Sequence, residues 1–278
     1  MWVSSAHCLL DGDLYGHMSS AIVGGVDRNV VFLLIAGIGS ALACGLGAVP
    51  VFLLGDRINA WRPALWGLAG GLMAAVSVEA LLWPALRLGG IGQSMLGLLS
   101  GIVFVLISHW LIRHGDLKAQ GLREADARRS ALIFVVLFVH SLPEGMAMGA
   151  AQASALQGLN IIVILAIALH HVPEGAMVAI PMASAGFGKR AQFWTAVLTS
   201  VPQPISAPIA YVLVDHAAVL LPASLAFAGG AMLATVALEL VPEALSVGMW
   251  RKGVAGILVG VAIIVVLGAI LGVWLGVV

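Results

Sequence analysis

Two short motifs of the same design carry side chains that could bind a metal ion. Both read His-x-x-Pro-Glu-Gly, the first over residues 140–145 and the second over residues 170–175. The second motif has an additional histidine, His171, where the first has Ser141. Imidazole nitrogen together with carboxylate oxygen suits Zn²⁺ best and also admits Fe²⁺, Mn²⁺, Co²⁺, Ni²⁺ or Cd²⁺, whereas oxygen ligands alone would indicate Mg²⁺ or Ca²⁺. The motifs therefore predict a site for a divalent transition metal.

Helix geometry predicts how the ligands of the two motifs face one another. Each residue of an α-helix advances about 100°, so Glu144 lies about 40° from His140, on the side towards Ser141. The second motif repeats this arrangement. If the two helices are antiparallel neighbours, both glutamates could bridge two adjoining pockets. The first pocket would hold His140, Glu144, His170 and Glu174, and the second would hold Ser141, Glu144, His171 and Glu174.

The chain that must position these motifs has the composition of a membrane protein. Of its 278 residues, 61% are hydrophobic and 9% are charged, whereas soluble domains carry about 25% charged residues. A membrane helix needs about 20 predominantly apolar residues, and runs of that length recur throughout the sequence. We therefore expect an all-α, polytopic membrane helix bundle with eight transmembrane helices, at residues 29–54, 63–86, 93–112, 131–153, 159–184, 191–213, 220–247 and 254–276.

The distribution of basic residues predicts the orientation of the bundle. With both termini outside the cytoplasm, every Lys and Arg except Arg28 and Arg87 falls in a cytoplasmic loop, as the positive-inside tendency requires. We expect residues 1–28 to form an extracytoplasmic tail and residues 29–278 to form the membrane domain. Residues 114–130 are expected to form its one long cytoplasmic loop.

Both motifs fall near the middle of their predicted helices, the fourth and the fifth. An ionisable side chain at that depth costs roughly 2.5–3.5 kcal/mol on insertion scales, and a shared cation would offset this cost for Glu144 and Glu174. Pro143 and Pro173 have no N–H to donate inside a helix, and the carbonyls that they leave free are tolerated where they line a wet cavity or contact a ligand. Hydrogen bonding between helices is the alternative role for these polar side chains.

These motifs, on the fourth and fifth of eight helices, resemble those of the ZIP (Zrt-, Irt-like protein) family of metal transporters, especially its bacterial branch. The resemblance implies uptake of Zn²⁺ and related ions towards the cytoplasm, with Met73 as a further ligand of the first pocket and Gln203 as a further ligand of the second. His109 and Glu239 resemble an exit route on the cytoplasmic side. This chain departs from the family pattern at Ser141, where Asn is usual, and at Gln203, where bacterial members have Glu. The second pocket is therefore expected to bind a metal more weakly.

The predicted function is transport, with no enzymatic activity, through a midplane site that is exposed to the two sides of the membrane in turn. The main alternative is an intramembrane zinc-dependent hydrolase. Such an enzyme needs an open metal position and a base that is not a ligand, whereas both glutamates here are placed as ligands. A scaffold protein is the second alternative, and it leaves the repeated acids unexplained.

The expected partners are divalent metal ions and the lipid bilayer, with no nucleic acid, and a homodimer is compatible with the sequence. The expected location is a cell membrane that the chain crosses many times, with the bacterial inner membrane as the compartment. The sequence does not rank Zn²⁺ against Fe²⁺, Mn²⁺ or Cd²⁺, and it leaves open whether one or two ions bind.

Overall fold

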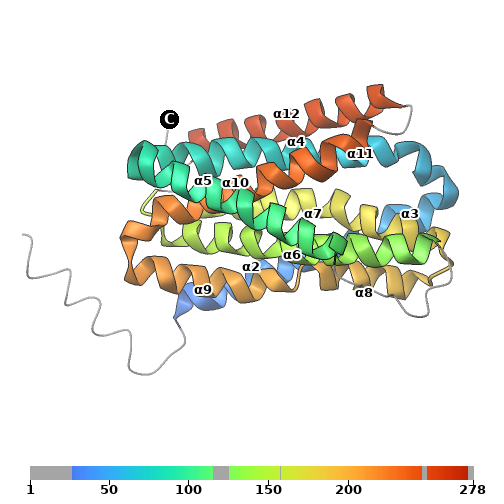
Figure 1. Ribbon diagram of the computed structural model, residues 1–278, viewed down its shortest axis with the longest axis horizontal. Helices are drawn as coiled ribbons and strands as arrows, with labels where there is room; N and C mark the ends of the chain where they lie inside the picture. The colour runs from blue at the N-terminus through green and yellow to red at the C-terminus, as the bar shows by residue number, and fades with distance from the viewer. Residues whose placement is uncertain (1–26, 115–124, 157, 246–248, 275–278) are drawn as a thin grey trace, which may run out of the picture.

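The computed structural model of the chain describes residues 27–114, 125–156, 158–245 and 249–274. All regular elements in these ranges are helical, which confirms the all-α prediction (Figure 1). Most of the predicted N-terminal tail lies outside the described residues. The α-helices are α2 (Arg28–Leu46), α3 (Val49–Leu54), α4 (Arg62–Val76), α5 (Trp83–His114), α6 (Ala125–Ala153), α7 (Leu159–Ser184), α8 (Lys189–Thr199), α9 (Pro202–His216), α10 (Leu221–Thr235), α11 (Val241–Leu245) and α12 (Trp250–Trp274).

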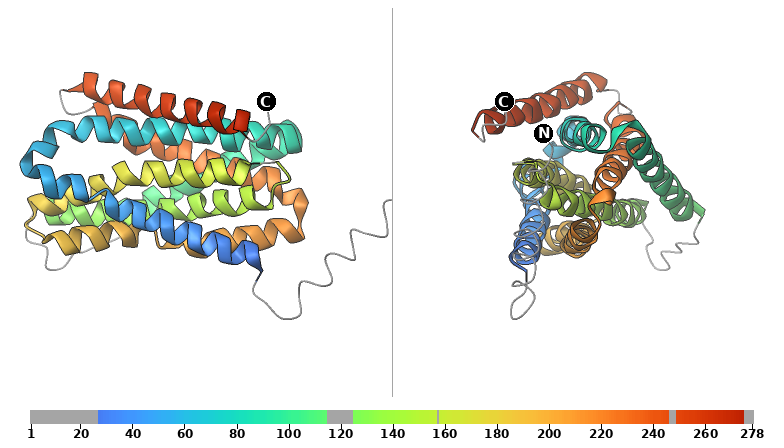
Figure 2. Two further views of the ribbon diagram at one scale, coloured as in Figure 1. Left: turned by 180° about the vertical axis from the view of Figure 1, so that it is seen from behind. Right: turned by 90° about the vertical axis from the view of Figure 1, so that its left-hand side faces the viewer.

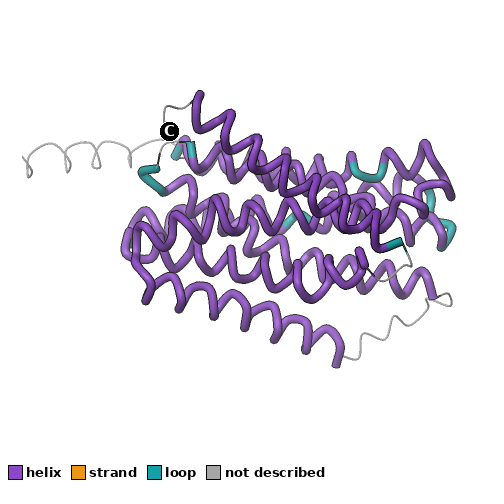
Figure 3. The backbone as a smooth tube through the Cα atoms, turned by 90° about the horizontal axis from the view of Figure 1, so that it is seen from above, coloured by secondary structure: helices purple, strands orange, loops and turns teal. Residues whose placement is uncertain are grey.

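Four short helical turns of other types connect these elements. Two are 3₁₀ turns, η1 (Gly55–Trp61) and η3 (Ala218–Leu220). The other two are π-helical turns, η2 (Ser77–Leu82) and η4 (Val236–Leu240), which follow directly on α4 and α10. Seen from above, the long helices run roughly along one common direction (Figure 3). This arrangement is the one that a membrane bundle requires.

Seven helical segments in the described part of the chain are long and apolar enough to cross a membrane. The second of them, Arg57–Ile112, has 56 residues, and as one straight helix it would measure about 84 Å against a hydrocarbon core of about 30 Å. Gly90 interrupts it with φ 67° and ψ −173°, a backbone conformation that favours glycine. In Figure 1 the chain reaches the left end of the bundle along α4 and returns along α5.

Part of the predicted cytoplasmic loop at residues 114–130 is helical in the structure. Helix α6 begins at Ala125, so the second part of the predicted loop is helical, and residues 115–124 lie outside the described residues. The start of α2 and the end of α12 lie at the same end of the bundle, on the left in Figure 1 and on the right in the reversed view of Figure 2.

The helices form two groups that we distinguish by their contacts. The first helix group consists of α2, α6, α7, α8 and α9, in which α6 packs along α9 and α2 along α7. The second helix group consists of α4, α5, α10, α11 and α12, in which α5 packs along α10 and α4 along α12. The end-on view in Figure 2 shows α12 and α4 together on one side of the bundle. The two groups meet mainly where α4 contacts α7 and where α10 contacts α6.

Small residues bring helix backbones together inside each group. Gly67 on α4 faces the carbonyl oxygen of Gly253 on α12, and Gly149 on α6 faces that of Ala207 on α9. Among the described glycines, every such approach to a neighbouring helix backbone is made within one group. In lipid, this kind of close packing drives helix association. Each group is therefore packed backbone against backbone, whereas the seam between the groups is filled by side chains.

A second repeat in the chain relates α4 to α10. Residues 69–73 and 228–232 both read Ala-Gly-Gly-x-Met, and both are followed by a π-helical turn that contains a glutamate, Glu79 in one case and Glu239 in the other. Single π-helical turns inside α-helices occur frequently at functional sites. The two turns therefore mark positions at which the second helix group departs from regular packing.

Candidate metal centre

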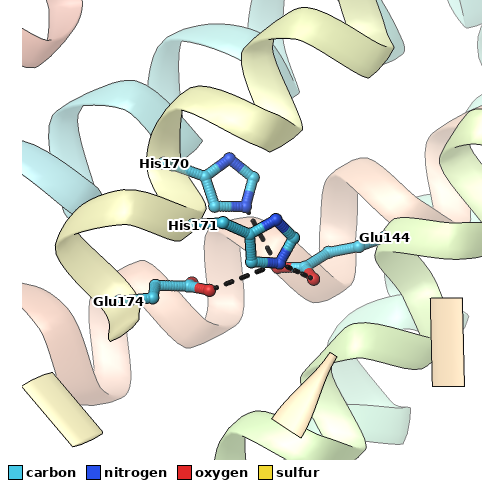
Figure 4. Close-up of side chains that lie close together, drawn as sticks. All are labelled: Glu144, His170, His171 and Glu174. Carbon is cyan, nitrogen blue, oxygen red and sulfur yellow. Dashed lines mark hydrogen bonds and ion pairs between the residues drawn. The ribbon is translucent and has the colours of Figure 1, made fainter. Parts of the chain in front are cut away.

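Four buried side chains from α6 and α7 converge in the first helix group. They are Glu144 from α6 and His170, His171 and Glu174 from α7, and one ligand atom of each lies within 4.8 Å of the others (Figure 4). All four are buried. Two imidazoles and two carboxylates supply the nitrogen and oxygen atoms that zinc prefers, and four is the usual number of ligands around it.

Glu144 joins the two histidines. Its Oε1 lies 3.2 Å from Nε2 of His170 and its Oε2 lies 3.3 Å from Nε2 of His171, while Oε2 of Glu174 lies 3.6 Å from the same nitrogen of His171. The centroids of the two imidazole rings are 4.9 Å apart. One carboxylate thus faces two different nitrogen ligands, which is the arrangement needed for a bridging ligand.

The hydrogen bond made by Nδ1 of His170 identifies the ring nitrogen that is available to a metal ion. Nδ1 lies 3.0 Å from the carbonyl oxygen of Ala166, and because a carbonyl only accepts hydrogen bonds, Nδ1 carries the proton. The other ring nitrogen, Nε2, lies 3.2 Å from Oε1 of Glu144. Because Nδ1 is bonded to the carbonyl, Nε2 is the nitrogen that a metal ion between these two side chains would contact. A ring N–H bonded to a carbonyl is also the usual support of a metal-binding histidine.

The glycine of each motif allows a neighbouring helix to approach closely. A side chain at Gly175 would collide with the carbonyl oxygen of Cys44 on α2, and one at Gly145 would collide with the Ser206 hydroxyl on α9. The helices that come close in this way bring further polar side chains to the cluster. From α9, Gln203 donates a 2.7 Å hydrogen bond from Nε2 to Oε2 of Glu144. From α2, the Ser40 hydroxyl lies 2.7 Å from Nδ1 of His171.

The first motif contributes only its glutamate to the cluster. The Nε2 atom of His140 lies 3.9 Å from Oε1 of Glu239 on η4, and Nε2 of His109 on α5 lies 3.6 Å from the same oxygen. Ser141 donates to the carbonyl oxygen of Leu137 in its own helix. His140 therefore lies in a second polar grouping with His109 and Glu239, and this grouping crosses the seam between the two helix groups.

The remaining residues suggested by the family resemblance are both buried. Met73 on α4 is 1% exposed and belongs to the main hydrophobic core, and Gln203 is completely buried beside Glu144. Ser40 was not predicted from the sequence, because a serine among the glycines and alanines of α2 has no distinctive spacing. Its position next to His171 follows from the packing of α2 on α7, where Gly175 faces the turn of α2 that follows Ser40.

Comparison with known proteins adds a family and several relatives. The family model described as ZIP Zinc transporter matches residues 113–268. The chain is 32% identical to Zinc transporter GufA of Myxococcus xanthus over 250 residues, which cover 86% of this chain and 98% of the relative. It is 27% identical to Zinc transporter ZIPB of Bordetella bronchiseptica over 264 residues, 91% of this chain and 85% of that protein. A relative from Arabidopsis thaliana is 32% identical over 209 residues, and the chain spans only 33% of its length.

Proposed function

Because the chain belongs to the ZIP family of zinc transporters, we propose that it carries Zn²⁺ across a membrane towards the cytoplasm. The observation that carries this proposal is the buried cluster of Glu144, His170, His171 and Glu174. The chain is a transporter of divalent metal ions and not an enzyme, and the alternative of a zinc-dependent hydrolase is not supported. Two acids buried at this depth are costly unless a cation is shared between them.

We propose that the chain crosses the membrane eight times with both ends outside. The seven apolar segments support this count, because the 56-residue segment is long enough for two crossings and turns at Gly90. An even number of crossings agrees with the position of the α2 start and the α12 end at the same end of the bundle (Figure 1). The starts of α4, α8 and α12 lie at the opposite end and carry the basic residues Arg62, Lys189, Arg190, Arg251 and Lys252. That end is therefore assigned to the cytoplasm.

The four-residue cluster is proposed as the centre of the main transport site. Met73 and His140 are proposed as additional ligands, and His140 would have to turn from Glu239 towards Glu144 to join them. Ser141 and Gln203 are proposed to belong to a weaker neighbouring pocket, in which Gln203 supplies an amide where a carboxylate would attract a second ion. Fe²⁺, Mn²⁺ and Cd²⁺ are further candidate substrates, since the same donors admit them.

We propose that the site is exposed to each side in turn by movement of the two helix groups against each other. The cluster and its supports lie wholly within the first helix group, which is also tied together at its outer end by side-chain hydrogen bonds. There Asn29 donates to the Tyr211 hydroxyl at 2.7 Å, Gln152 donates to Asn29 at 3.0 Å, and Asn160 donates to Gln152 at 2.9 Å. His109 and Glu239 belong to the second group and are proposed as the exit route. His140 contacts this route across the seam.

The chain is a multi-pass membrane protein. We propose the bacterial inner membrane as its location, since GufA and ZIPB are bacterial relatives that it matches over most of their length. The homodimer stays a prediction, which cross-linking in native membranes would test.

Uptake into liposomes that contain a zinc-sensitive dye tests the proposed function. The wild-type protein should admit Zn²⁺, and His170→Ala and Glu174→Ala should abolish the influx. His216→Ala is the matched control, because this exposed histidine bonds only to the carbonyl oxygen of Val212 in its own helix among the contacts described. Tight zinc binding without flux, under every pH gradient applied, would overturn the proposal.

A further inference from the structure

The Ser40 hydroxyl contacts His171 at the ring nitrogen that faces away from the cluster. Ser40 is 1% exposed and its Oγ lies 2.7 Å from Nδ1 of His171. The two helices that carry these residues are held close by glycines on both sides, since Gly175 of α7 faces the carbonyl of Cys44 and Gly47, directly after α2, faces that of Val172. The contact is therefore built into the packing of α2 against α7.

The direction of this hydrogen bond follows from the residues on the opposite side of the ring. Glu144 fixes the orientation of the Gln203 amide. Of the two polar groups of that amide only the NH₂ group can donate to a carboxylate oxygen, and its nitrogen Nε2 lies 2.7 Å from Oε2 of Glu144. The same amide nitrogen lies 3.0 Å from Nε2 of His171. Nε2 also lies 3.3 Å from Oε2 of Glu144 and 3.6 Å from Oε2 of Glu174, so it is the nitrogen that a metal ion in the cluster would contact. A neutral imidazole that offers the lone pair of Nε2 to a metal carries its proton on Nδ1, and the Ser40 hydroxyl lies 2.7 Å away as the acceptor of that proton.

We propose that Ser40 is a positioning residue for metal binding: its hydroxyl accepts the Nδ1–H of His171 and keeps the lone pair of Nε2 turned to the space between Glu144 and Glu174. This inference rests on the proposed function, because it concerns the same site. His170 has the corresponding support from the carbonyl of Ala166 in its own helix. His171 also has a backbone hydrogen bond with Ile167 in its own helix, and the Ser40 hydroxyl adds a contact at Nδ1 from a different helix.

A purely structural role for Ser40 makes different predictions from a positioning role. If Ser40 only fills space between α2 and α7, then Ser40→Ala should behave like any substitution of a buried serine by alanine. Ser94 on α5 provides this control, because it is also 1% exposed and its hydroxyl has no hydrogen-bond partner in the described structure. Ser40→Thr provides the converse variant, since it keeps the hydroxyl and adds a methyl group to the packing.

Zinc binding and zinc uptake are measured for the wild type, Ser40→Ala, Ser94→Ala and Ser40→Thr, alongside the melting temperature of each. Outer supports of metal-binding histidines are worth about 10- to 100-fold in metal affinity. We expect Ser40→Ala to weaken zinc binding and to raise KM by about that factor, with Ser94→Ala unchanged and Ser40→Thr restored to near the wild type. Equal affinities of Ser40→Ala and Ser94→Ala would overturn the proposal, as would a Ser40→Thr variant as impaired as Ser40→Ala.

A spectroscopic measurement tests the inference independently of transport. The metal-free protein is labelled with ¹⁵N-histidine, and the signals of His171 are assigned by their loss in His171→Gln. Nitrogen chemical shifts at neutral pH should show Nδ1 protonated and Nε2 bare in the wild type, and a mixture of both tautomers in Ser40→Ala. A proton on Nε2 in the wild type would overturn the inference even if uptake is observed. Absence of uptake with the expected shifts would instead contradict only the proposed function.

Discussion

The two copies of the His-x-x-Pro-Glu-Gly motif have the same residues at most positions and different roles in the structure. In the α7 copy, His170, His171 and Glu174 all face the buried cluster. In the α6 copy only Glu144 does, while His140 lies beside Glu239. The difference arises from the side chains beside each motif, because Ser40 and Gln203 of the same helix group lie beside His171, whereas Glu239 of the other group lies beside His140. The same motif can therefore place several side chains in the cluster at one copy and make a contact between the two helix groups at the other.

The most severe change should be the loss of the one carboxylate that contacts both histidines. Glu144→Gln should weaken zinc binding at least about tenfold more than Glu174→Gln, a difference of about 1.4 kcal/mol. The reason is that Glu144 faces both His170 and His171, whereas Glu174 lies near His171 only. Isothermal titration of the purified proteins with Zn²⁺ measures both affinities. Equal losses would contradict the assignment of Glu144 as the bridging ligand.

Replacement of the first histidine in each motif separates the two copies directly. His170→Ala should weaken zinc binding by more than about 100-fold, because even the outer supports of such ligands are worth 10- to 100-fold. His140→Ala should weaken it by about tenfold or less and should mainly slow uptake, since His140 contacts Glu239 rather than the cluster. Affinity and initial uptake rate are measured for each variant. An affinity loss in His140→Ala as large as that in His170→Ala would mean that the copies are equivalent.

Substitution of the two motif glycines by alanine should destabilise the protein to different extents. Gly175→Ala would place Cβ against the backbone carbonyl of Cys44, and overpacking of this kind costs about 1–3 kcal/mol. In Gly145→Ala the closest atom is the Ser206 hydroxyl, which can rotate away, and the nearest backbone atom is the carbonyl oxygen of Gln203 at 2.8 Å, so the backbone has less far to move than at Gly175. Gly175→Ala should therefore lower the melting temperature more than Gly145→Ala, as measured by thermal unfolding in detergent. The opposite order would show that α9 constrains its motif more than α2 does.

Addition of a carboxylate beside the first motif should make the two pockets more alike. Gln203→Glu places a second acid next to Glu144 and Nε2 of His171, where the amide now donates hydrogen bonds. We expect the number of zinc ions bound per chain at saturation to rise from one towards two, measured by elemental analysis of the dialysed protein. An unchanged number would indicate that charge at position 203 does not limit the second pocket.

The smallest effect is expected at Ser141, one of the two positions where the motifs differ in sequence. Ser141→Ala should change zinc affinity and uptake by less than about twofold, because the Ser141 hydroxyl bonds to Leu137 in its own helix and such local bonds contribute little. The equivalent position in the other copy is His171, at the centre of the cluster. A large loss in Ser141→Ala would show that the serine joins the site in another state of the transport cycle.

Much of the fold follows from simple features of the sequence. The apolar runs predict the helices well, and the position of the motifs along those runs places Glu144 next to the α7 histidines. Helix angles alone could not predict the direction of His140, because that depends on Glu239 and His109, which lie far along the chain. The helical start of α6 at Ala125 was missed for a related reason, since a polar stretch can extend a membrane helix beyond the bilayer.

The proposed role of Ser40 is the feature of the site that is hardest to predict from the sequence. Serine is common in helices of small residues, and its meaning here depends on a glycine contact between α2 and α7 and on the orientation of Gln203. Long-range packing of this kind leaves no spacing in the sequence. The change from Glu to Gln at position 203, by contrast, was visible in the sequence, and the structure gives the amide a specific hydrogen-bonding partner in Glu144.

If the buried cluster on α6 and α7 binds the transported ion, anomalous diffraction from zinc-soaked crystals should locate the ion there. We expect a strong peak at the zinc absorption edge among Glu144, His170, His171 and Glu174, which disappears in Glu144→Gln crystals soaked in the same way. Zinc peaks confined to the protein surface, or to the grouping of His109, His140 and Glu239, would contradict it.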